Sequence, residues 1–129
     1  MARFEDDGEM MPETKSLKDE IVRLSDELTE AISDLRMHSR DWAKKDNEMR
    51  KARAKAFLQA TGKNKEEREA RADASYEKER LAANLAEAEK NVAQEHVRSL
   101  RAQISALQSL VYANRAESES IRYGQTQTT

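Results

Sequence analysis

Apolar residues recur every three or four positions along most of the chain. Over residues 17–56 they follow steps of four and three, the heptad spacing of a helix that packs along a narrow seam. The twelve positions of this first seam are Leu17, Ile21, Leu24, Leu28, Ala31, Leu35, His38, Trp42, Lys45, Met49, Ala52 and Ala56. So sustained a repeat predicts one long helix within residues 14–61.

A second apolar seam lies in the C-terminal half. It starts with Leu81, Leu85, Ala88 and Val92, and continues with a one-residue offset through Ala93, Val97, Leu100, Ile104, Leu107, Val111 and Asn114. Ala106 and Leu110 widen the apolar set here, which makes this the strongest apolar stripe in the chain. The pattern predicts a second long helix over residues 66–122.

Residues 62–65 separate the two predicted helices. Gly62 can follow a helix end, where φ is often positive. Asn64 can cap the next helix, with Glu67 reaching back to the cap. So short a connection favours an antiparallel hairpin. The alternative is one continuous helix weakened at Gly62.

Composition narrows the fold class to all-α. Charged residues make up 37% of the chain and hydrophobic residues another 37%, with three Gly, one Pro and six aromatic residues. Such a chain can fill a thin seam but not a thick core, and a thin seam needs partner helices. We therefore expect a long helical hairpin with coiled-coil seams that assembles into a helical oligomer, with flexible tails at residues 1–13 and 123–129. The residues expected to drive assembly are Leu17, Ile21, Leu24, Leu28, Leu35, Trp42, Val97, Leu100, Ile104, Leu107, Leu110 and Val111.

The chain offers little for catalysis or membrane insertion. It has two histidines, His38 and His96, and no Cys, and it lacks a Gly-rich phosphate loop. Its acidic residues alternate with Lys and Arg at i,i+4 spacing, which is typical of a solvated face. The N-terminus is acidic, and no stretch approaches about 18 apolar residues. We expect a cytoplasmic protein that is not an enzyme, with no metal, cofactor, membrane or small-molecule substrate.

Charge divides the chain into three parts. Residues 1–41 carry a net charge of −6, residues 44–71 of +5 and residues 72–129 of −1. The basic part surrounds the predicted turn and is the candidate nucleic-acid site. Its ten basic residues are Lys44, Lys45, Arg50, Lys51, Arg53, Lys55, Lys63, Lys65, Arg68 and Arg71.

Aromatic residues lie close to this basic part, namely Trp42, Phe57 and Tyr76. Basic and aromatic residues together can hold a phosphate backbone while bases stack. The alternative is an ordinary solvated helix face. Trp42 fits a packing anchor better than a stacking platform. The polar seam residues His38, Lys45 and Asn114 are typical of positions that set register.

The stretch EMRKARAKAFLQATGKNKEEREARADASYEKERLAANLAEAEKNVAQEHVRSLRAQISALQSLVYANRAESESI resembles a family of small phage proteins. A basic, Ala-rich helix end precedes a Gly-containing turn and a polar stretch, and a long helix then carries the pattern L-R-x-x-I-x-x-L-x-S-L from Leu100 to Leu110. This pattern is similar to the UvsY-type phage recombination mediators and covers about residues 42–121.

The resemblance implies a largely helical, ring-like oligomer that loads a recombinase onto single-stranded DNA coated by single-strand binding protein. It implies DNA binding through Lys44, Lys45, Arg50, Lys51, Arg53 and Lys55, and assembly through Leu100, Ile104, Leu107, Leu110 and Val111. The acidic heptad from Leu17 to Leu35 departs from the family pattern and could dock a basic partner.

Three functions follow from these features. The first is a recombination mediator that binds single-stranded DNA, recombinase and single-strand binding protein as a homo-oligomer in the host cytoplasm. The second is a structural or scaffolding coiled coil of a phage particle or cell. The third is a small helical inhibitor or adaptor that acts through its acidic arm.

Overall fold

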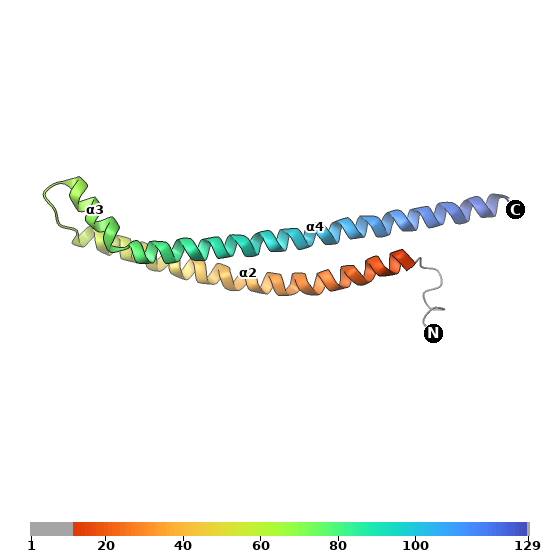
Figure 1. The fold of residues 1–129 in the computed structure, drawn as a ribbon, viewed down its shortest axis with the longest axis horizontal. Helices are drawn as coiled ribbons and strands as arrows, with labels where there is room; N and C mark the ends of the chain where they lie inside the picture. Colours follow the sequence, from red (N-terminus) through yellow and green to blue (C-terminus); the bar gives the residue numbers. More distant parts are fainter. Residues whose placement is uncertain (1–11, 129) are drawn as a thin grey trace. The chain divides into compact units, whose positions relative to one another are not determined.

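The described chain is entirely helical apart from two short interruptions. The computed structural model describes the backbone of residues 12–128 and the side chains of residues 13–121. Three helices account for this part of the chain, and no strand occurs in it: α2 (Pro12–Gln59), α3 (Lys65–Ser75) and α4 (Glu77–Thr128) (Figure 1). The all-α prediction is confirmed, whereas most of the predicted N-terminal tail lies outside the described residues.

Contacts divide the protein into two compact units. The terminal unit comprises the described parts of residues 1–30 and 97–129, and the central unit comprises Ala31–His96. In the terminal unit the first part of α2 runs antiparallel to the second part of α4 (Figure 1). In the central unit the remainder of α2 leads through α3 back to the first part of α4, so that this unit is a helical hairpin.

Local sequence accounts for the length of α2 and α4. Both are rich in Ala, Leu, Glu, Lys and Arg, which lose little side-chain freedom in a helix. Ion pairs between successive turns add support, as Arg23 shows by pairing with both Glu20 and Glu27. The hydrogen bond from Arg23 holds the pKa of Glu20 below its usual range. Pro12 begins α2, where its missing N–H costs no hydrogen bond.

The first predicted seam is the face of α2 that packs inside the protein. All twelve of its positions are buried or half-buried. Leu24 and Ala31 are the most enclosed, with 2% and 4% of their surface exposed. The four-and-three spacing therefore identified the inward face of α2 along its whole length.

The second predicted seam packs within the chain only in its C-terminal part. Ala93 and the following seam positions through Asn114 are buried or half-buried, but Leu81, Leu85, Ala88 and Val92 are exposed. Within the chain these four positions therefore lie outside the packed face. The packed face is instead an unbroken heptad row along α3 and α4. Four of its first seven residues are alanines. The whole row consists of Ala72, Tyr76, Glu79, Ala83, Ala86, Lys90, Ala93, Val97, Leu100, Ile104, Leu107, Val111, Asn114 and Ser118.

Small residues take this place because α2 presents bulky side chains in the central unit. Ala83 and Ala86 on α4 expose only 3% and 2% of their surface. Trp42 and Met49 on the seam of α2 are half-buried. Alanines on one helix leave room for the larger side chains of the other.

The connection between α2 and α3 spans residues 60–64, so α2 ends two residues before the predicted Thr61. Asn64 caps α3, because its Oδ1 accepts a hydrogen bond of 2.8 Å from the Glu67 N–H. The Glu67 carboxylate reaches back and accepts from the Lys63 N–H at 3.1 Å. The predicted cap is thus confirmed, with the return bond one residue earlier than in a standard capping box.

Gly62 serves a different purpose from the one predicted. Among the described residues no glycine has a positive φ. A Cβ at Gly62 would instead come within 3.1 Å of the Arg68 backbone N and within 3.2 Å of the Glu67 Cγ. The absence of a side chain at Gly62 therefore lets the connection pass close to the first turn of α3.

The predicted second helix is two helices, because the backbone departs from helical geometry at Tyr76 (φ −115°, ψ 15°). Tyr76 is 7% exposed, and its hydroxyl donates to Asp73 Oδ1 at 3.3 Å. The Ser75 hydroxyl donates to the Ala72 carbonyl at 2.9 Å, a local bond that competes with the helix ladder. At the other end α4 continues to Thr128, beyond the predicted end at residue 122, since no Pro interrupts it.

Truncation of the α2 seam should lower stability. Replacing Leu24 by Ala removes a buried side chain and leaves a cavity, so we expect the free energy of unfolding to fall by at least about 2 kcal/mol. Leu58→Ala is the matched control on the same helix, because Leu58 is 87% exposed. Urea unfolding followed by far-UV circular dichroism measures both variants. Equal destabilisation by the two substitutions would contradict the packing described above.

Candidate nucleic-acid interface

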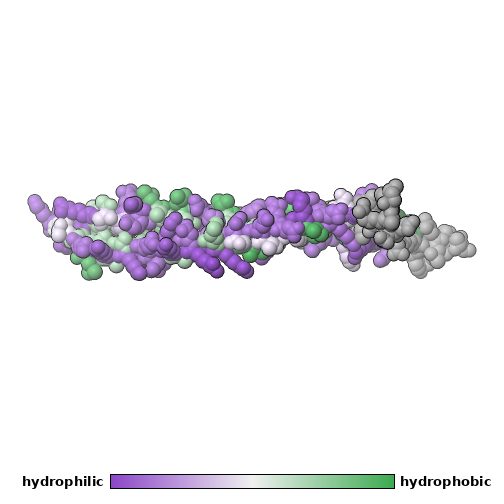
Figure 2. All heavy atoms as spheres, turned by 90° about the horizontal axis from the view of Figure 1, so that it is seen from below, coloured by the Kyte–Doolittle hydropathy of each residue, from purple (hydrophilic) through white to green (hydrophobic). Residues whose placement is uncertain are grey.

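All ten basic residues of the predicted site lie in the central unit. Six lie on the last turns of α2, Lys63 lies in the connection and three lie on α3. Lys45 is half-buried and the other nine are exposed. Hydrophilic side chains cover most of the face seen in Figure 2, with green hydrophobic side chains exposed between them. The structure therefore gathers the predicted cations around one end of the hairpin.

Four of the ten cations are paired with acidic residues on the same helix. The donor–acceptor distances are 2.9 Å for two pairs, 3.1 Å for the third and 3.8 Å for the fourth; the pairs are Arg50–Asp46, Arg71–Glu67, Lys45–Asp41 and Lys65–Glu69. Each pair partly neutralises the local field. Arg71 also donates to the Thr61 carbonyl at 3.3 Å, so it ties α3 to the connection.

Three lysines form an exposed row on α2 that faces away from its packed seam. Lys44, Lys51 and Lys55 are seven and four residues apart, which places them on one side of the helix over about 16 Å. In the described part of the chain none of the three makes an ion pair. We call this row the lysine stripe. It is half of the six basic residues of the predicted segment that make no ion pair in the described chain; the other three are Arg53, Lys63 and Arg68.

A shallow hollow of about 320 Å³ lies on another face of α2, lined by Arg50, Arg53, Ala54 and Phe57. Phe57 is 42% exposed, and the Arg53 guanidinium lies 5.5 Å from the centre of its ring. Two guanidinium groups beside an exposed ring can bind a phosphate and stack a base together. The sequence pattern pointed to Phe57 only as a nearby aromatic, although the spacing of 50, 53 and 57 already places these residues on one face.

The two other aromatics near the basic segment are occupied by packing. Trp42 is half-buried against α4, and the Lys90 Nζ lies 4.1 Å from the centre of its ring. Tyr76 is buried at the junction of α3 and α4. The interpretation of Trp42 as a packing anchor is therefore favoured, and Phe57 is the aromatic that can reach a ligand.

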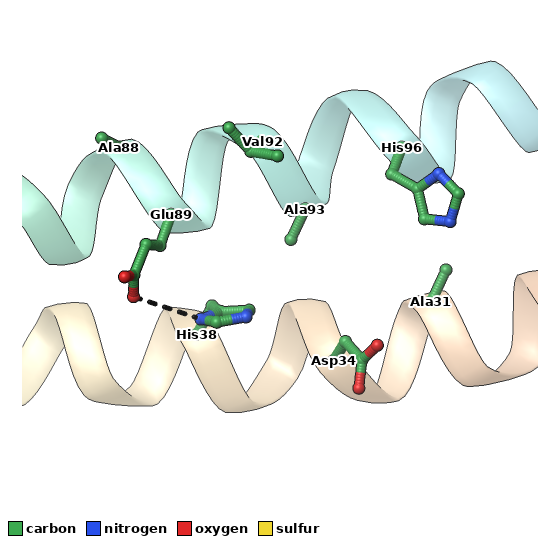
Figure 3. Close-up of a pocket in the computed structure, with 8 residues that line it drawn as sticks. All are labelled: Ala31, Asp34, His38, Ala88, Glu89, Val92, Ala93 and His96. Atoms are coloured by element: carbon green, nitrogen blue, oxygen red, sulfur yellow. Dashed lines mark ion pairs between the residues drawn. The ribbon is translucent and has the colours of Figure 1, made fainter.

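Polar seam residues make cross-helix contacts within each unit. In the central unit His38 Nδ1 lies 3.8 Å from Glu89 Oε2, an ion pair when the histidine is protonated (Figure 3). In the terminal unit the Asn114 Nδ2 donates to the Thr14 hydroxyl at 3.5 Å, and Thr14 is 4% exposed. Such contacts restrict sliding of one helix along the other, as expected for register-setting residues.

The residues predicted to drive oligomerisation lie mostly in the seam of the chain itself. Of the twelve predicted residues, only Leu110 is exposed, with 51% of its surface accessible. The other eleven, including Trp42, are buried or half-buried in this seam. Their side chains are therefore occupied by intrachain packing: Leu17, Ile21, Leu24, Leu28, Leu35, Val97, Leu100, Ile104, Leu107 and Val111. A contact between copies that leaves this packing intact would use another face of the helices.

Comparison of the chain with protein-family models, with curated proteins and with solved structures finds no match. Within the described residues no group of three or more His, Asp or Glu side chains is placed to hold a metal ion. None of the described helices combines the length and apolarity needed to cross a membrane. The exposed cations and Phe57 are therefore the features of the described chain that point to a ligand.

Trp42 gives a direct optical test of this packing, because it is the single tryptophan of the sequence. Lys90→Ala removes the cation from its ring and should cost about 0.5–2 kcal/mol of stability. The tryptophan emission should change in intensity or wavelength, whereas the exposed control Lys51→Ala should leave it unaltered. Steady-state fluorescence of the two folded variants measures the Trp42 emission and compares it with that of the wild type. Unchanged emission in Lys90→Ala would contradict the observed contact.

Proposed function

We propose that the protein binds single-stranded DNA through the C-terminal end of α2 and acts as a recombination mediator rather than as an enzyme. The observation that carries the proposal is the lysine stripe together with the exposed Phe57 ring, which lies on another face of the same end of α2. The three lysines supply positive charge that no acidic side chain of the described chain neutralises. Phe57 and Arg53 supply a stacking surface at the same end of the helix.

The lysine stripe supports electrostatic binding of a phosphate backbone. Binding of Lys to phosphates releases condensed counterions, so the affinity falls steeply as salt is added. The ion-paired cations contribute less, because a phosphate must compete with a carboxylate already in place. The lysine stripe should therefore account for a large share of the salt dependence, because it supplies three of the six basic residues that make no ion pair.

The position of Phe57 favours single strands over duplexes. An unpaired base can stack on an exposed aromatic ring, whereas the bases of a duplex are already stacked on one another. The adjacent Arg50 and Arg53 can hold the flanking phosphate while the base lies on the ring. The proposed preference for single strands therefore depends on this hollow and not on the lysine stripe.

Self-association belongs to the same proposal. A helical oligomer with coiled-coil seams repeats the lysine stripe once per copy and strengthens the local field. The resemblance to UvsY-type mediators supports the further steps, in which the oligomer engages a recombinase and single-strand binding protein in the host cytoplasm. A scaffolding coiled coil would share the helices and seams but would have no need of the lysine stripe, so charge removal separates the two functions.

Removing the lysine stripe should weaken DNA binding strongly. We expect Lys44→Gln/Lys51→Gln/Lys55→Gln to lower the affinity for a single-stranded oligonucleotide by tenfold or more at low salt. The slope of log affinity against log salt should become shallower by about two, because three phosphate contacts are lost. Fluorescence anisotropy over a salt series measures both quantities.

The matched control removes three positive charges from another part of α2. Lys18→Gln/Arg36→Gln/Arg40→Gln changes the net charge by the same amount but leaves the lysine stripe intact. This variant should retain most of the affinity and the original salt slope. Equal losses in the two triple variants would show that net charge, and not the stripe, governs binding.

Phe57→Ala should reduce the preference for single strands. Loss of one stacked base costs about 1–3 kcal/mol, so the affinity for single-stranded DNA should fall roughly tenfold while that for duplex changes little. Leu58→Ala, one residue further on, is the control for loss of an exposed apolar side chain. Competition between labelled single strands and unlabelled duplex measures the ratio. A preserved ratio in Phe57→Ala would exclude stacking on this ring.

A further inference from the structure

One face of α4 in the central unit carries apolar side chains that the packing of the chain leaves uncovered. Leu81, Leu85 and Val92 expose 57%, 62% and 71% of their surface, and Ala88 between them is also exposed. Their spacing of four, three and four residues is that of a helix-packing seam. We call these four residues the outer stripe, to distinguish it from the row that packs against α2.

A charged residue lies at each end of the outer stripe. Lys78 precedes Leu81 by three residues and Glu95 follows Val92 by three, so both continue the heptad spacing. Both side chains are exposed. Read along α4, the row therefore runs from a positive charge through four apolar residues to a negative charge.

This order is complementary to itself when two copies run antiparallel. Leu81 then faces Val92 of the second copy, and Leu85 faces Ala88. In the same register Lys78 faces Glu95, and a two-fold axis level with residues 86–87 repeats every contact. A parallel arrangement would place like charges opposite one another at both ends, which is unfavourable.

A groove beside the outer stripe provides room for the second copy. It has a volume of about 500 Å³ and lies between α2 and α4, where Ala31 and Ala93 project into the space between the helices (Figure 3). Ala88 and Val92 form its rim on α4. In the antiparallel register the two leucines of the second copy lie over Ala88 and Val92, at the edge of this groove.

We propose that a second copy of this chain binds the outer stripe, with the two α4 helices antiparallel and Lys78 paired with Glu95 of the other copy. This contact specifies the self-association that belongs to the proposed function, but it requires no DNA. It also accounts for assembly while the seam residues stay buried within each chain. The outer stripes of the two copies cover each other reciprocally.

Sedimentation equilibrium of the full chain without DNA tests the contact. We expect a reversible dimer in the micromolar range, and we expect Leu81→Gln/Val92→Gln to weaken its dissociation constant by tenfold or more. The control Leu58→Gln/Val22→Gln changes the same residue types at exposed sites of α2 and should associate like the wild type. A monomeric wild-type protein, or unaltered association of Leu81→Gln/Val92→Gln, would overturn the proposal.

Cysteine cross-linking tests the register and does not depend on a weakened variant. The sequence has no Cys, so introduced cysteines report alone. Under mild oxidation Leu81→Cys/Val92→Cys should form a covalent dimer. Neither single variant should, since equivalent positions lie about 16 Å apart along antiparallel helices and a disulfide needs Cα atoms within about 7 Å. Efficient cross-linking of Leu81→Cys alone would overturn the antiparallel arrangement.

Both experiments are performed without DNA, which keeps the two proposals apart. Failure to associate or to cross-link overturns the antiparallel contact, whatever the DNA-binding measurements give. The lysine-stripe variant should lose DNA affinity but still form the dimer. That result would leave the antiparallel contact between the α4 helices unaffected. Far-UV circular dichroism of each variant verifies that the helices are retained.

Discussion

The structure depends on the packing of large side chains of α2 against small ones of α4. In the central unit the enclosed positions of α4 are mainly alanines, with Ala83 and Ala86 almost fully covered. Because alanines fill the inward face, the leucines and valine of the same helix segment lie on the outside. The basic end of α2 is likewise free to face solvent, since its inward positions are satisfied by half-buried residues such as Met49.

How far the sequence predicts this arrangement differs between the two long helices. The seam of α2 could be predicted in full, because its large apolar residues follow a strict heptad and no second apolar row competes with it. On α4 the leucines at 81 and 85 outweigh the neighbouring alanines in any hydrophobicity pattern, although Ala83 and Ala86 are the residues buried on the inward face. The positive φ predicted for Gly62 is wrong. Gly62 is instead required by its close approach to Arg68, a contact that local sequence does not reveal.

The position of the positive charge could be predicted from the sequence. Which basic and aromatic residues are available to a ligand could not. Counting basic residues located the positive end of the hairpin. The division of the ten cations into four that are ion-paired and six that are not, the lysine stripe among them, depends on which carboxylates lie within reach, as with Arg50 and Asp46. Burial likewise separates the aromatics, since Trp42 and Tyr76 are used in packing while Phe57 is exposed beside Arg53. The cluster of basic residues, the lack of ion pairs in the lysine stripe and the exposure of Phe57 together favour a binding surface over an evenly solvated helix face.

The account is tested most directly by fluorescence anisotropy of the wild-type protein with single-stranded and double-stranded oligonucleotides of equal length, from low to physiological salt. Binding that prefers single strands and weakens steeply with salt is the predicted result, because phosphate contacts and one stacked base supply the affinity. Absence of binding at low salt, or an affinity that stays flat as salt is added, would contradict a nucleic-acid function for the basic end of α2.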